Sequence, residues 1–103
     1  MAHQLVWSPE AVEDIESIAS YIERDSPWYA KAVVSRIIAI AEAIPEYPQL
    51  GKMVPEIGSA AIRERLVSSY RVIYRVESAR ILMVAVIHGS RLLQPLIPRI
   101  ESQ

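Results

Sequence analysis

Apolar residues recur at three- and four-residue spacing in two segments of the first half of the chain, the pattern of amphipathic helices. The first set follows Ser8-Pro9 and comprises Val12, Ile15, Ile18, Ala19 and Ile22. The second set follows Ser26-Pro27, ends before Pro45, and comprises Ala30, Val33, Val34, Ile37, Ile38, Ala41 and Ile44. Serine caps a helix N-terminus and proline fits its first turn. The pattern therefore predicts two helices, joined closely enough to form an antiparallel hairpin.

The second half of the chain has the composition of strands. Three segments rich in β-branched and aromatic residues are separated by only two residues each, which predicts two hairpins: 61–67, 70–77 and 80–89. Residues 81–87 are wholly apolar, as expected of a central strand covered on both faces. The apolar run 3–7 predicts an edge or leading strand. We expect 49–60 to be a loop and 92–100 to be a last turn or an irregular segment.

The predicted order is β-α-α-β-β-β, an α+β fold in a single domain over residues 1–103. We expect the N-terminal strand and the helical hairpin to pack on one face of a small, mainly antiparallel sheet. Alternation along 70–77 assigns Arg71 and Arg75 to the opposite face, which we expect to be partly open. Glu64 points away from Arg63 and Arg65, and we expect it to pair with an arginine of the next strand.

Charge is divided unequally between the two halves of the chain, although the formal net charge is only −1. Residues 1–50 carry three Lys or Arg against eight Asp or Glu, whereas 51–103 carry eight against four. Seven of those eight cations are arginines, which suit carboxylate or phosphate contacts. The division predicts an acidic helical hairpin and a cationic sheet. Ordinary solvated strand residues are the alternative to a binding role for Arg63, Arg65, Arg71, Arg75 and Arg91.

Several classes of chemistry are disfavoured by the composition. The chain has no cysteine, which excludes disulfides, thiolate metal sites and a cysteine nucleophile. His3 and His88 lie at opposite ends of the chain and no acidic cluster has ligand spacing, so we expect no metal and no cofactor. The longest apolar run, 81–87, is far shorter than the roughly 20 residues of a membrane-spanning helix. With no secretory leader pattern, we expect a cytoplasmic protein without membrane contact.

His88 is the residue best suited to catalysis, because it ends the predicted central strand and a histidine can act as a general acid or base near pH 7. With Arg71 stabilising a pentavalent phosphate, it could support metal-independent RNA cleavage by the 2′-hydroxyl. The alternative is that His88 caps the strand and hydrogen-bonds the backbone. We attribute the scattered Trp and Tyr residues to packing rather than to base stacking.

Seven short phrases span nearly the whole chain, at residues 7–11, 14–22, 48–52, 54–56, 63–64, 70–76 and 86–91. The first reads Trp-Ser-Pro-Glu-Ala and the last reads Val-Ile-His-Gly-Ser-Arg. Together with the order β-α-α-β-β-β, they resemble the RelE/ParE superfamily of bacterial toxins. The resemblance implies a type II toxin–antitoxin module, in which a cognate antitoxin wraps the toxin. The antitoxin itself binds operator DNA, so this chain would meet that DNA only indirectly.

The superfamily implies two alternative activities. RelE-like members cut mRNA on the ribosome, and in that case His88 and Arg71 would be catalytic. ParE-like members inhibit DNA gyrase and lack the nuclease residues. This chain has only two lysines and no tyrosine after Tyr74, and its net charge gives little attraction to RNA. We therefore expect a gyrase inhibitor, with a ribosome-dependent endoribonuclease and a non-toxic antitoxin-binding member as alternatives.

Overall fold

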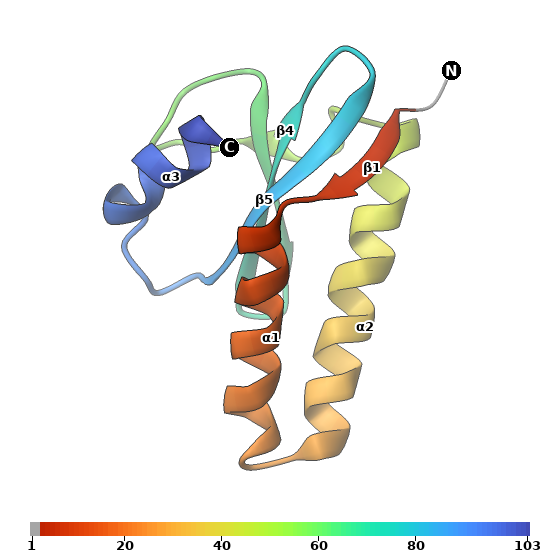
Figure 1. The fold of residues 1–103 in the computed structure, drawn as a ribbon, viewed down its shortest axis with the longest axis vertical. Coiled ribbons are helices and arrows are strands. Elements are labelled where there is room, and N and C mark those ends of the chain that lie inside the picture. The colour runs from red at the N-terminus through yellow and green to blue at the C-terminus, as the bar shows by residue number, and fades with distance from the viewer. Residues whose placement is uncertain (1–2) are drawn as a thin grey trace.

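The computed structural model describes residues 3–103 as an α+β fold (Figure 1). Its elements are β1 Gln4–Trp7, α1 Pro9–Glu23, α2 Pro27–Ala43, η1 Ile44–Glu46, β2 Lys52–Met53, β3 Ile62–Val67, β4 Tyr70–Val76, β5 Arg80–His88, η2 Gln94–Leu96 and α3 Ile97–Ser102. α1 and α2 form the predicted hairpin, whose closed end extends away from the sheet (Figure 1). The predicted order of elements is confirmed, with η1, β2, η2 and α3 added to it.

Both helices of the hairpin begin where the sequence predicts. The Ser8 hydroxyl accepts a hydrogen bond from the Ala11 backbone N–H at 3.1 Å. The Ser26 hydroxyl accepts one from the Tyr29 N–H, also at 3.1 Å. Each serine thereby satisfies one of the N–H groups that a helix start leaves without a partner. These caps fix the phase of the apolar stripes, and hence the helix faces that meet the sheet.

The five strands form one sheet in the order β1-β5-β4-β3-β2. β1 runs parallel to β5, and the remaining pairs are antiparallel, which confirms a mainly antiparallel sheet. β2 lies within the predicted loop 49–60, so that prediction is wrong at these two residues. The two-residue strand β2 is too short to show a hydrophobic period, and its pairing with β3 depends on close approach of the two backbones. A Cβ on Gly51 would lie 2.5 Å from the Glu64 carbonyl oxygen. Only glycine at this position allows the backbones to meet.

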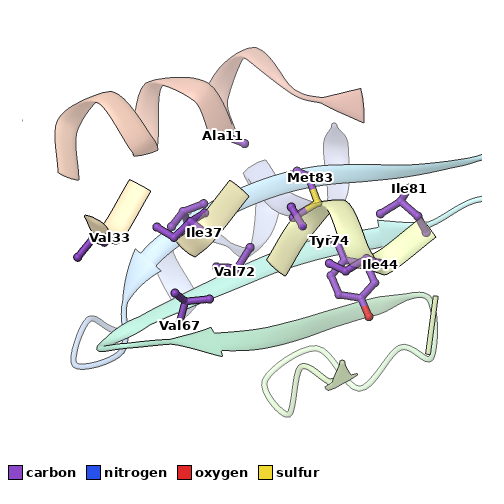
Figure 2. Packing of buried hydrophobic residues seen from close by; sticks show 11 residues of the cluster. Ala11, Val33, Ile37, Ile44, Val67, Val72, Tyr74, Ile81 and Met83 are labelled. Carbon is purple, nitrogen blue, oxygen red and sulfur yellow. The ribbon is translucent and has the colours of Figure 1, made fainter. Parts of the chain in front are cut away.

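The face beneath the hairpin is an apolar core. Figure 2 shows Ile37 of α2 and Ile44 of η1 facing the sheet residues Val72 and Tyr74. The fully enclosed members also include Ala11, Val33, Ala41, Val67, Ile81, Met83 and Val86. The Tyr74 hydroxyl reaches the rim of this core, where it donates to the Pro48 carbonyl at 2.8 Å and accepts from the Gly51 N–H at 2.9 Å. The ring therefore joins the core to the loop before β2.

The opposite face of the sheet is also covered, so the expectation of a partly open, arginine-bearing face is wrong. A second apolar cluster lies there and comprises Val54, Ile62, Ile73, Leu82, Val84, Ala85, Ile87, Leu93 and Ile100. Its last two members come from the tail, which folds into η2 and α3 instead of leaving the sheet exposed. Apolar tail residues gain more by burial on this face than by remaining in water.

Candidate functional site

Arg71 is the centre of a buried ion cluster on the face covered by α3. Its Nε donates to Glu64 Oε1 at 2.5 Å, and its two Nη atoms donate to the Glu56 carboxylate at 2.8 Å each. Arg71 is 8% exposed and Glu64 is 3% exposed. The hydrogen bonds from Arg71 hold the pKa of Glu56 at about 2, and the same bonds raise the pKa of Arg71. The predicted pairing of Glu64 with an arginine of the next strand is confirmed.

Arg75 and Arg63 are likewise engaged within the fold. Arg75 donates to Glu77 at 3.0 Å, to the Ile100 carbonyl at 3.3 Å and to the Gln103 carbonyl, so it fastens the end of the chain to β4. Arg63 donates to the Ala60 and Gly51 carbonyls at 2.9 Å each. A role for these arginines in binding a partner would require these internal bonds to break.

Arg71 and His88 are not brought together. In the β4–β5 ladder Tyr70 lies opposite His88, whereas Arg71 lies opposite Ile87. Directly opposed residues share a face and successive residues alternate, so Arg71 and His88 project from opposite faces of the sheet. Ile87 belongs to the apolar cluster on the α3 face, and Tyr70 packs against the core under the hairpin.

His88 is exposed at the end of β5. Its Nδ1 lies 2.7 Å from the Ser90 hydroxyl and accepts a hydrogen bond from the Ser90 backbone N–H at 3.1 Å. The Tyr70 ring meets the imidazole edge to face, with centroids 5.4 Å apart. Because Nδ1 accepts a hydrogen bond from the Ser90 backbone N–H, the neutral ring carries its own proton on Nε2. These contacts are those expected of a histidine that caps the strand and hydrogen-bonds the backbone.

His88 lines a groove of about 510 Å³ between α1 and the end of β5. Its walls are formed by Asp14, Ser17, Ile18 and Tyr21 of α1, by Tyr70, Val86 and Ile87, and by Ser90 and Arg91. Arg91 is exposed and forms no ion pair with any residue of the described range 3–103. Burial raises the pKa of Tyr70, so this phenol stays protonated at neutral pH. The groove combines a strand end, aromatic rings and an uncompensated cation.

Of the remaining sequence-predicted arginines, Arg65 lies half-buried on β3 and forms no ion pair within residues 3–103. Arg65 and Arg91 are therefore the two of the five whose side chains form neither an ion pair nor a hydrogen bond within the described part of the chain. The other three serve the fold. Sequence alternation assigned their faces correctly but could not reveal their partners, because Glu56, Ala60 and Ile100 are brought near by loops and the tail.

Exposed aromatic residues gather at the closed end of the hairpin, contrary to the attribution of Trp and Tyr to packing. Trp28 is 76% exposed, Tyr21 is 67% exposed and Tyr29 is 47% exposed. The prediction holds for Tyr74, which is fully buried. A signal was available for Trp28: it lies two residues before Ala30, the first position of the apolar stripe, and two residues turn a helix by about 200°. Trp28 thus faces away from the core.

Within residues 3–103 no three acidic or histidine side chains are placed to hold a metal ion. The same range contains no helix that is both long and apolar enough to cross a membrane.

Comparison with known proteins agrees with the fold. Residues 5–93 match the family model of the ParE toxin of the type II toxin–antitoxin system parDE. The chain is 31% identical over 90 residues to Toxin RelE2 of Caulobacter vibrioides, covering 86% of this chain and 98% of that protein.

Two solved structures resemble the fold at low sequence identity. One is the chromosomal ParDE toxin–antitoxin system of P. aeruginosa, with a TM-score of 0.70, 18% identity, and coverage of 84% of this chain and 96% of that chain. The other is a mutant of E. coli toxin RelE in the free state, with a TM-score of 0.69, 16% identity, and coverage of 99% and 97%. The two likenesses show a shared fold.

Proposed function

The chain belongs to the ParE toxin family and is a type II toxin–antitoxin toxin of the RelE/ParE superfamily, and we propose that it inhibits growth by poisoning DNA gyrase. In this proposal it acts in the cytoplasm and is neutralised by a cognate antitoxin. No cofactor takes part.

The separation of His88 from Arg71 is the observation that carries this proposal. A metal-independent nuclease needs a proton-transfer group and a cation at one phosphate. Here the two residues project from opposite faces of the sheet, and two carboxylates neutralise Arg71. Breaking that buried cluster to free Arg71 would leave Glu64 without its guanidinium partner. A function through protein–protein contact needs no such rearrangement.

The exposed aromatic residues of the hairpin end supply a surface for that contact. We assign gyrase binding to Tyr21, Trp28 and Tyr29, because large aromatic side chains dominate the energetics of protein interfaces. The end extends away from the sheet, so it can enter a recess of a larger protein (Figure 1). Arg65 and Arg91, whose side chains form no such bonds within the described chain, are assigned to the target or the antitoxin.

A supercoiling assay with purified toxin and gyrase tests the proposal. We expect loss of supercoiling and accumulation of cleaved DNA at stoichiometric toxin, and at least tenfold weaker inhibition by Trp28→Ala. Tyr47→Ala is the matched control, because Tyr47 is an exposed aromatic residue outside the hairpin end. Full gyrase activity in excess wild-type toxin would overturn the proposal.

Ribosome-dependent mRNA cleavage is the second candidate, and the groove around His88 and Arg91 favours it. The exposed imidazole, the Tyr70 ring and the free guanidinium could hold a nucleotide without any help from Arg71. Translating ribosomes with a defined mRNA distinguish the two functions. Cleavage that is lost in His88→Ala would select this candidate, and intact mRNA would leave gyrase as the target.

A further inference from the structure

The side of α2 that faces away from the sheet carries a stripe of exposed side chains. Val33, Ile37 and Ala41 are buried and mark the side of the helix that meets the core. Each residue turns an α-helix by about 100°, so the opposite side recurs at alternating three- and four-residue spacing. The stripe on that side, which we call the α2 stripe, comprises Trp28, Lys31, Ser35, Ile38 and Glu42, all of them exposed. Pro45 continues the spacing just beyond the helix.

The α2 stripe stays uncovered in the part of the chain that the structure describes. α2 runs along one margin of the fold, with α1 beside it (Figure 1). Trp28 is the most exposed of the large apolar side chains in residues 3–103. Lys31 and Glu42 take part in no ion pair over the same range. Tryptophan is among the residue types that dominate protein interfaces, so the stripe has the composition of a contact surface.

The two charges of the α2 stripe have opposite signs and lie towards opposite ends of the helix. Lys31 is near the start of α2 and Glu42 is in its last turn, about 16 Å further along the axis. The helix dipole disfavours a negative charge in the last turn, so helix stability does not account for Glu42. A second copy of the helix, turned by a two-fold axis to run antiparallel, places its Glu42 opposite Lys31 and its Lys31 opposite Glu42. The stripe is therefore complementary in charge to itself.

The same register matches large side chains of the stripe to small or flat ones. With Lys31 opposite Glu42, the seven-residue repeat places Ser35 opposite Ile38 of the second copy. The short serine leaves a hole into which the isoleucine can pack. At the two ends of the contact, the Trp28 ring lies against Pro45 of the second copy. Both the charges and the side-chain volumes therefore favour one antiparallel register.

We propose that the free toxin forms a two-fold symmetric dimer in which the α2 stripes of two copies pack antiparallel. The two-fold axis passes midway between Ser35 and Ile38, and two Lys31–Glu42 ion pairs flank it. A contact along one helix of about 25 Å buries less than the ~1,600 Å² of a standard interface, so the dimer is weak and dissociates at micromolar concentration. It covers Trp28, and dimerisation therefore withholds this side chain from a target.

Sedimentation equilibrium of the purified toxin, without gyrase or antitoxin, tests the dimer. We expect a monomer–dimer equilibrium that Lys31→Glu or Glu42→Lys weakens at least tenfold, because each change sets two like-charged pairs across the axis. Glu13→Lys is the matched control, since Glu13 is an exposed glutamate of α1, and it should associate as the wild type does. A wild-type toxin that stays monomeric at its highest soluble concentration, or a dimer that neither reversal weakens, would overturn the proposal.

Mixing the two charge-reversed variants tests the antiparallel register. In a heterodimer of Lys31→Glu with Glu42→Lys, one chain is acidic at both positions and the other is basic at both. Both ion pairs then form, so we expect the mixture to associate about as strongly as the wild type, although each variant alone associates weakly. This recovery also shows that both variants are folded. A mixture no stronger than its components would contradict the register.

A single introduced thiol tests the contact without reference to charge. The chain has no cysteine, so Ser35→Cys gives one reactive site, which a short bismaleimide is expected to link to its copy in a second chain. Ser20→Cys on the exposed side of α1 is the control and should stay unlinked. Equal cross-linking of the two would contradict the contact. These measurements use the toxin alone, so an absent dimer leaves gyrase as the target, and full gyrase activity leaves the dimer in place. If the toxin alone is monomeric and Lys31→Glu loses affinity for gyrase or antitoxin, the stripe belongs to that partner and the proposal fails.

Discussion

The two faces of the sheet are covered by different physical means. Under the hairpin, two capped helices of regular period pack apolar stripes onto β3, β4 and β5. On the opposite face, an apolar cluster is supplemented by polar bonds. Ion pairs of Arg71 hold the loop after β2, and the Arg99–Asp14 pair and hydrogen bonds from Arg75 to tail carbonyls hold a six-residue helix. Short, irregular segments bury little surface of their own, so directional charge pairs fix them in place. Cations on this face therefore stabilise the fold and are not available to a target.

Arg71→Met is expected to cause the largest loss of stability, because it removes the ion cluster on the face covered by α3. Glu64 would remain buried without its guanidinium partner, and removal of one member of a buried pair costs about 4 kcal/mol. We expect the urea midpoint to fall accordingly. Arg65→Met on the neighbouring strand is the matched control, because Arg65 forms no ion pair within residues 3–103, and its effect is expected to stay within about 0.5 kcal/mol. Equal stabilities of the two variants would mean that the ion cluster does not hold this face.

Ile37→Ala tests the face under the hairpin, where apolar burial and not ion pairing stabilises the packing. Ile37 is fully enclosed between α2 and the sheet, and such truncations cost about 3 kcal/mol through lost burial and a residual cavity. Ile38→Ala, on the exposed side of the same helix, is expected to cost less than about 1 kcal/mol. The loss at Ile37 should be independent of pH, unlike any loss at the ion cluster. A pH-dependent loss would show that the two faces are not separate.

The same contrast explains how far the sequence predicts this molecule. The caps at Ser8 and Ser26 and the apolar periods that follow them are local signals, so the hairpin and its core face were predictable. The partners of Arg71 and Arg75 come from a loop and from the tail, and no local pattern links them to β4. Alternation could assign the arginines to a face but not show that α3 covers it. The spacing of the α2 stripe is present in the sequence, but that this side of the helix stays uncovered is likewise a property of the folded chain.

Tyr74→Phe tests the one side chain that joins the hairpin core to the segment before β2. The ring would keep its packing, but the Gly51 N–H would lose its acceptor and the Pro48 carbonyl its donor. We expect a loss of about 2 kcal/mol, because buried polar groups left without partners are costly. Tyr47→Phe is the control, since Tyr47 is largely exposed, and it should leave the denaturation midpoint unchanged. A neutral Tyr74→Phe would mean that packing alone seats this loop.

The smallest expected effect is a loss of stability at low pH that arises from the ion pairs and not from the apolar core under the hairpin. Bonds from Arg71 lower the pKa of Glu56 from 4.5 to about 2, and bonds from Arg80 lower that of Glu77. A depressed carboxyl pKa gives stability that is fully present above pH 4.5 and is lost as the pH falls towards about 2, because the unfolded chain takes up the proton first. Urea midpoints measured down this range should therefore fall for the wild type and fall less steeply for Glu56→Gln. The urea midpoint of Ile37→Ala should be lower than that of the wild type at every pH and should change with pH as steeply as the wild-type midpoint does. If Glu56→Gln keeps that slope too, the pH response arises outside the Arg71 cluster, and the ion pairs would no longer distinguish the two faces.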